Sequence, residues 1–271
     1  MYIDVHTHIG HSKFQPDRAQ AIRRAIDAGV AAIVENGLDP SSNRFTLQLA
    51  QAYSQIKPAL GIYPINAVNS KLGNDFPIMV EKFDVDAEID FIETQARSGS
   101  IAAIGECGLD GYWLDEVTFS EQERVLERLI EVAKRHCLPI ILHTRKLEQR
   151  CFEIIAHNRV ERCNFHCYGG RVRLAKSMAE QHGWCFSIPP NAVHNEAFQK
   201  MIVELPFECL LTETDAPYLA PEKGLRNEPA FVVGTVELIA RLRNKTVDEI
   251  KGGLVENFCR LFSPKWYPKE M

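Results

Sequence analysis

Short apolar runs alternate along the chain with longer segments in which apolar side chains recur every three to four residues. The first run lies within the first ten residues, and seven more follow at 30–34, 58–62, 101–104, 139–142, 164–166, 184–188 and 208–212. Runs of this length with few polar interruptions are typical of strands buried on both faces. The sequence therefore predicts eight strands of a parallel sheet.

The segments between the runs have the spacing of amphipathic helices. In the longest, 119–136, Val125, Leu129, Val132 and Ala133 fall on one face. Further helices are predicted at 16–28, 41–55, 87–98, 147–157, 172–182, 196–204, 229–242 and 247–262. Eight strand–helix units in this length are what an α/β fold of the closed (β/α)8 TIM barrel type requires.

The alternative is an open, doubly wound sheet. The first turn after a strand has no G-x-G-x-x-G pattern, which disfavours the dinucleotide-binding form of that fold. No linker or charge block divides the chain, so we expect one domain over 1–271. The longest irregular stretch, 63–83, is expected to lie as a loop over the site.

Composition narrows the class of protein. Apolar residues make up 45% of the chain and charged residues 25%, which is typical of a soluble protein. No apolar stretch approaches the roughly 20 residues that span a bilayer, and no secretion signal is visible. The eight cysteines lack C-x-x-C spacing, so we expect free thiols in the cytoplasm. The net charge of −5 would not attract nucleic acid, so a phosphodiester substrate would need local positive charge.

Candidate chemistry begins at the first strand. His6 and His8 are two residues apart, so in a strand they project to the same side and could hold one ion. Imidazole is a common ligand of transition metals. Among nine histidines a His-x-His pair can also arise by chance, so the pair gains weight only from the other strands.

Four more ionisable side chains follow apolar runs. Glu106, His143, His166 and Asp215 stand at the ends of the fourth, fifth, sixth and eighth strands. Alone, such a histidine is usually a hydrogen-bonded core residue and such a carboxylate a helix cap. In a barrel, however, the carboxyl ends of the strands converge on the face that carries active sites. Six such residues at one phase of the repeat predict a two-metal site.

Six blocks in this order resemble the TatD family of metal-dependent hydrolases, which are amidohydrolase-like barrels. They are DVHTH at 4–8, AIGECGLD at 103–110, PIILHTR at 139–145, FHCYG at 165–169, LTETDAPYL at 211–219 and RNEP at 226–229. The blocks span nearly the whole chain. The resemblance implies deoxyribonuclease activity, chiefly 3′→5′ exonuclease action on single-stranded DNA, with Mg²⁺, Mn²⁺ or Zn²⁺.

The resemblance also implies how the ligands are shared between two divalent ions. One ion would be held by His6, His8, Glu106 and Asp215, and the other by Glu106, His143 and His166, with Glu106 bridging. Two ions about 3.5–4 Å apart could lower the pKa of a water between them. Asp215 could accept the proton of this water and return it to the leaving group.

Three side chains are candidates for substrate binding. Arg145 lies two residues past His143 and could pair with a phosphate, as could Arg226, because the guanidinium group matches phosphate geometry. Arg145 could instead form an ion pair with Glu213 or Glu148. Tyr63 could donate a hydrogen bond or stack on a base.

The chain departs from many relatives after its third strand. Where they carry Gly-x-His-Pro-His, residues 61–65 are Gly-Ile-Tyr-Pro-Ile, so both histidines are missing. Since one barrel supports many chemistries, two alternatives stay open. The chain could hydrolyse another ester or amide, or it could be a metal-binding subunit of a larger assembly.

Overall fold

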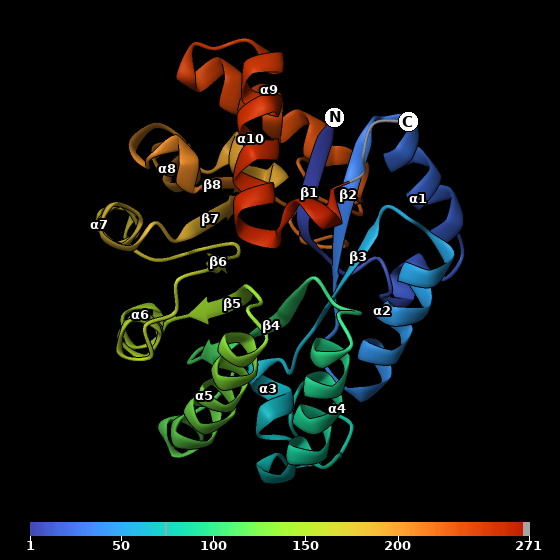
Figure 1. Cartoon of the computed structure of the whole chain (residues 1–271), viewed down its shortest axis with the longest axis vertical. Helices are drawn as coiled ribbons and strands as arrows, with labels where there is room; N and C mark the ends of the chain where they lie inside the picture. The colour runs from blue at the N-terminus through green and yellow to red at the C-terminus, as the bar shows by residue number, and fades with distance from the viewer. Residues whose placement is uncertain (74, 268–271) are drawn as a thin grey trace.

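Eight parallel strands follow one another around a ring in chain order (Figure 1). The structure is a computed structural model and describes residues 1–73 and 75–267. The strands are β1 (Tyr2–Thr7), β2 (Val30–Asn36), β3 (Ile56–Leu60), β4 (Ala103–Asp110), β5 (Ile140–Arg145), β6 (Cys163–Phe165), β7 (Cys185–Ile188) and β8 (Leu210–Thr212). The predicted (β/α)8 barrel is confirmed.

Helices surround the strands on the outside of the ring (Figure 1). They are α1 (Arg18–Asp27), α2 (Pro40–Ala52), α3 (Pro64–Ala67), α4 (Val85–Arg97), α5 (Phe119–Arg135), α6 (Glu148–His157), α7 (Val172–His182), α8 (Glu196–Glu204), α9 (Val232–Arg243) and α10 (Val247–Phe262). Of the helices in the described part of the chain, none is both long and apolar enough to cross a bilayer.

The seam between β1 and β8 closes the ring through individual hydrogen bonds. The Thr212 hydroxyl donates to the Ile3 carbonyl at 2.7 Å, and the Asp215 amide donates to the His6 carbonyl at 2.8 Å. The buried Asp4 carboxylate accepts from the Thr214 amide at 2.9 Å. The closure therefore fixes the position of residues that carry the predicted chemistry.

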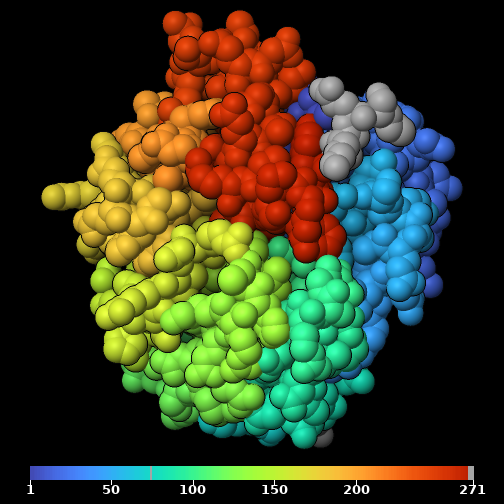
Figure 2. Space-filling model, viewed as in Figure 1, coloured from blue at the N-terminus to red at the C-terminus, as the bar shows by residue number. Residues whose placement is uncertain are grey.

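One end of the barrel is closed by α10. Phe258, Leu261 and Phe262 are buried against apolar side chains near the amino ends of the strands, including Ile3 and Ala103. Figure 2 shows the C-terminal segment covering the centre of this face of the molecule. The site must accordingly be sought at the carboxyl ends of the strands.

Two sequence-based expectations need correction. The stretch 63–83 is not wholly irregular, because Pro64 begins the short helix α3 and a 3-10 turn follows at Asn69–Lys71. Ile65 and Val68 of this stretch pack against Leu114 in a small apolar cluster. The fourth strand runs to Asp110 rather than ending at residue 104, so Glu106 lies within a strand.

Candidate metal centre

The six predicted ligand residues meet at the carboxyl ends of the strands. His6 Nε2 and His8 Nε2 are 3.2 Å apart, and both lie within 3.6 Å of Asp215 Oδ1. His143 Nδ1 and His166 Nε2 are 3.3 Å apart. Most of these side chains are buried, while those of His143 and Asp215 are partly open to solvent.

Glu106 stands between the two groups of histidines. Its Oε2 atom lies 3.5 Å from His6 Nε2 and 3.2 Å from His8 Nε2. Its Oε1 atom lies 3.1 Å from both His143 Nδ1 and His166 Nε2. Each carboxylate oxygen therefore faces its own pair of imidazoles.

These separations fit the ligand shell of metal ions. Ligand atoms that share one ion at about 2.1 Å lie about 3.0–3.4 Å apart, close to the distances observed here. Three overlapping groups each keep their donor atoms within 4.8 Å: His6, His8 and Glu106; Glu106, His143 and His166; and His6, His166 and Asp215. Imidazole with carboxylate suits Zn²⁺, Mn²⁺ and similar ions. The residues present could thus hold divalent metal.

The end of β1 is held in place by β2. His8 Nδ1 lies 3.0 Å from the Asn36 carbonyl oxygen, which leaves Nε2 directed at the site. The buried Glu35 carboxylate accepts from the amides of Ile9 and Gly10 at 2.7 and 2.8 Å. Sequence reasoning missed both contacts, because each depends on how β1 and β2 are aligned.

A bulge in β4 aims Glu106 inward. From Ile104 to Cys107 the chain advances three positions along β4, while the paired residues of β5, Ile140 to Leu142, advance only two. A β-bulge of this kind redirects a side chain. Gly105 permits it, since a Cβ there would lie 2.8 Å from the Ala59 main chain.

Asp110, at the end of the same strand, fixes His143. Its Oδ2 atom lies 3.1 Å from His143 Nε2, which leaves Nδ1 for the metal side. Carboxylates commonly orient metal-binding histidines in this way. Asp110 belongs to the AIGECGLD block, but its sequence position alone did not reveal this partner.

Glu213 performs a related role for the segment of His166. The carboxylate is fully buried and accepts from the Cys167 amide at 2.8 Å and from the Ser187 hydroxyl at 2.5 Å. His166 Nδ1 lies 3.9 Å from Glu213 Oε2. Glu213 therefore fixes the backbone next to a ligand, and it does not form the ion pair with Arg145 that the sequence allowed.

Asp215 is presented by a tightly held loop. Its backbone has a φ of 52°, a conformation that costs a non-glycine residue free energy. Asn227 holds the loop by donating from Nδ2 to the carbonyls of Thr214 and Tyr218, both at 2.6 Å. The side-chain amide of Asn227 therefore fixes the loop that carries Asp215.

The charges within the cluster favour an ionised carboxylate. Burial opposes the charge on Glu106, but His166 and His143 hold its pKa well below the usual range. Burial and the neighbouring His166 lower the pKa of His6 to about 4. A charged Glu106 and a neutral His6 are forms that bind metal. Burial opposes the charge on His8 and His143, but the neighbouring carboxylates raise the pKa of both, so a metal ion must displace a proton from these two imidazoles.

The candidate substrate residues have different surroundings. The Tyr63 ring lies edge-on to His143 at 4.9 Å, at the site, whereas Arg145 Cζ stacks 3.7 Å above the Tyr112 ring at the rim. Arg226 forms a two-point ion pair with Asp17 at 2.6 and 2.8 Å. A phosphate contact by Arg226 would therefore require this pair to break.

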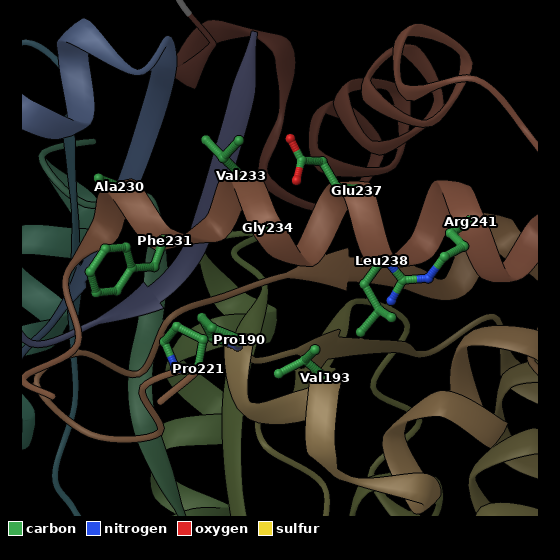
Figure 3. Close-up of a pocket in the computed structure, with 10 residues that line it drawn as sticks. All are labelled: Pro190, Val193, Pro221, Ala230, Phe231, Val233, Gly234, Glu237, Leu238 and Arg241. Carbon is green, nitrogen blue, oxygen red and sulfur yellow. The ribbon is translucent and has the colours of Figure 1, made fainter. Parts of the chain in front are cut away.

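A separate apolar groove of about 370 Å³ lies between α9 and the turn Pro190–His194. Figure 3 shows Leu238 of α9 pointing toward Val193. The lining residues include none of the six predicted ligands, so this groove is distinct from the candidate metal centre.

A ring of eight parallel strands, with imidazole and carboxylate donors collected at their carboxyl ends, defines the class of metal-dependent hydrolase barrels. Residues 3–263 match the family model described as TatD related DNase. The chain belongs to the TatD family.

Known proteins over the same length support this assignment. The chain is 31% identical to an uncharacterized metal-dependent hydrolase of Methanocaldococcus jannaschii, with 96% of each chain covered. It is 28% identical to the 3′-5′ ssDNA/RNA exonuclease TatD of Pectobacterium carotovorum, covering 96% of this chain and 98% of that one. The crystal structure of the TatD homologue YjjV from Escherichia coli superposes with a TM-score of 0.83 at 25% identity, with 96% and 97% covered.

Proposed function

We propose that this protein is a metal-dependent 3′→5′ exonuclease acting on single-stranded DNA, with two divalent cations held by the six clustered residues. The observation that carries the proposal is the position of Glu106, whose two oxygens face separate histidine pairs. His6, His8 and Asp215 would complete one ligand set, and His143 and His166 the other.

Bound divalent cations supply Lewis acidity, which acidifies a water and neutralises charge on the scissile phosphate. The chain must then move a proton and hold the substrate. Asp215 Oδ1 faces His6 and His8, so we assign Oδ2 to accept the proton and pass it to the leaving oxygen. Arg145 at the rim would hold a phosphate oxygen, and Tyr63 would contact the nucleotide beside His143.

The choice of substrate is supported by relatives rather than by the barrel alone. The exonuclease of Pectobacterium carotovorum carries a name that includes both single-stranded DNA and RNA. Because the overall charge is −5, the anionic nucleic acid must be attracted locally at the site, where bound cations and Arg145 would supply positive charge.

The test is digestion of a 5′-labelled single-stranded oligonucleotide after loading with Mg²⁺, Mn²⁺ or Zn²⁺. We expect products shortened stepwise from the 3′ end, and loss of this activity in Glu106→Ala. Glu180→Ala, on the exposed surface of α7, is the matched control. Hydrolysis of phosphate-free esters or amides without any shortening of the oligonucleotide would overturn the proposal.

A further inference from the structure

Exposed aromatic rings in the segment that follows β4 gather with cations at the end of β5. Tyr112 and Trp113 are 50% and 37% exposed, and their rings meet edge-on at 5.0 Å. Arg145 Cζ lies 3.7 Å above the Tyr112 ring, and Lys146 Nζ lies 5.6 Å from its centroid. We call these four residues the β4 ledge.

The β4 ledge is tied to the candidate metal centre through Asp110. One carboxylate oxygen, Oδ1, accepts from the amides of Tyr112 and Trp113 at 2.7 and 2.8 Å. The other, Oδ2, faces His143 Nε2 at 3.1 Å. A ring that binds substrate here is thus held at a fixed position relative to a metal ligand.

A second group of the same composition follows β8. Tyr218 is 45% exposed, and its hydroxyl lies 3.3 Å from His11 Nε2. Lys13 Nζ lies 5.0 Å from the centre of the Tyr218 ring. The Tyr218 amide donates to the Asp215 carbonyl at 2.9 Å, so this group also adjoins a ligand. We call His11, Lys13 and Tyr218 the β8 ledge.

The two ledges lie on opposite sides of the ring. The β4 ledge follows β4 and β5, and the β8 ledge follows β8 and β1, half a circuit away in the strand order. The six ligand residues lie between them, because they come from β1, β4 and β5 and from the segments that follow β1, β6 and β8. A chain molecule that contacts both ledges must therefore cross the candidate metal centre.

We propose that the two ledges stack the two bases that flank the scissile phosphodiester of a single-stranded nucleic acid. Exposed aromatic rings provide stacking platforms that accept any base, and adjacent cations neutralise the strand. The inference rests on the proposed function and adds that bases on both sides of the bond are bound, without sequence preference.

The test combines removal of a ring with removal of a base. We measure kcat/KM for oligothymidylates that are intact, or abasic at the terminal or the penultimate 3′ nucleotide. The enzymes are wild type, Tyr112→Ala, Tyr218→Ala and the corresponding Phe variants, which retain the ring. Val117→Ala, 81% exposed in the same segment as Tyr112, is the control.

We expect each Tyr→Ala change to lower kcat/KM on the intact strand by about 5- to 150-fold, the value of one stacked base. For each tyrosine we expect the Tyr→Ala change to have no effect on one of the two abasic substrates, because the base that the ring would stack on is missing there. The abasic position that removes the effect should differ between Tyr112 and Tyr218. The Phe variants recover most of the rate. Equal losses on all three substrates, or both losses vanishing with the same abasic position, would overturn the inference.

Binding separates this inference from the proposed function. Titration of the metal-loaded protein with intact oligothymidylate should quench the part of the tryptophan emission that is missing in Trp113→Phe, and a fully abasic strand should not. Quenching without strand shortening would retain the ledges and refute the exonuclease. If the strand is shortened but neither quenching nor a Tyr→Ala effect is seen, the exonuclease is retained and the ledges are refuted.

Discussion

The rings of His6 and His166 stack 3.8 Å apart with an angle of 10° between their planes. His6 belongs to β1 and His166 follows β6, so this contact joins the two histidine pairs that face Glu106. A substitution that moves one of these two rings should therefore also shift the position of the other.

Removal of metal is expected to destabilise the whole barrel. A ligand at 100 times its dissociation constant contributes about 2.7 kcal/mol to stability, and the chelated protein loses that contribution. We predict a lower unfolding temperature after chelation, measured by calorimetry, and recovery when Zn²⁺ or Mn²⁺ is restored. If neither the chelator nor the added metal changes the unfolding temperature, the cluster binds no ion.

Asp110→Asn tests how His143 is positioned. The amide retains an oxygen for the Tyr112 and Trp113 amides but removes the charge that faces His143 Nε2. We expect a 10- to 100-fold loss of metal affinity, the usual effect of removing such a partner. The exposed Asp115→Asn in the same segment is the control. Equal affinities in the two variants, measured by competition with a chelating dye, would refute the role.

Asn227→Ala tests the loop that carries Asp215. The change leaves the carbonyls of Thr214 and Tyr218 without their donor in a buried setting, which costs about 1–3 kcal/mol. Asn227→Asp keeps the shape but not the donor, so it should be at least as harmful. Urea unfolding measures both variants. Wild-type stability in both would show that other contacts hold the loop.

Arg226→Ala separates a structural role from phosphate binding. Its partly exposed pair with Asp17 should contribute about 0.2–1 kcal/mol, reduced by salt. We expect a smaller effect on kcat/KM than that of Arg145→Ala. If Arg226→Ala lowers kcat/KM more than Arg145→Ala does, Arg226 rather than Arg145 binds the phosphate.

The same pair predicts a dependence of stability on pH. Arg226, followed by Arg24, holds the pKa of Asp17 well below its usual range. Such a carboxyl group stabilises the fold above its unfolded pKa of about 3.9, and the contribution is lost as the pH falls through the folded value. The stability difference between wild type and Asp17→Asn should therefore shrink between pH 7 and pH 3. A difference that grew on acidification would contradict this assignment.

Sequence alone predicted the barrel because buried parallel strands leave an unmistakable alternation of apolar runs and helices. It also predicted that His6, His8 and Glu106 would meet, since the ends of the strands converge regardless of details. These inferences need only the period of each element and the order of the elements along the chain.

The contacts that position the ligand residues could not be predicted from the sequence. Asp110 pairs with His143 only because β4 extends farther than its apolar run, past a bulge at Gly105 and Glu106. Arg226 has the chemistry of a phosphate ligand, yet its nearest partner, Asp17, is more than 200 positions away in the chain. Such pairings depend on three-dimensional packing that no local pattern encodes.

The most direct test of the account is a crystal structure with anomalous diffraction at the absorption edge of the loaded metal. We predict two peaks, one between Glu106 and His8 and the other between Glu106 and His143, with two equivalents of metal by elemental analysis. Glu106→Ala should lose both. A single peak, or metal bound away from Glu106, would contradict the central claim that this carboxylate joins two ions.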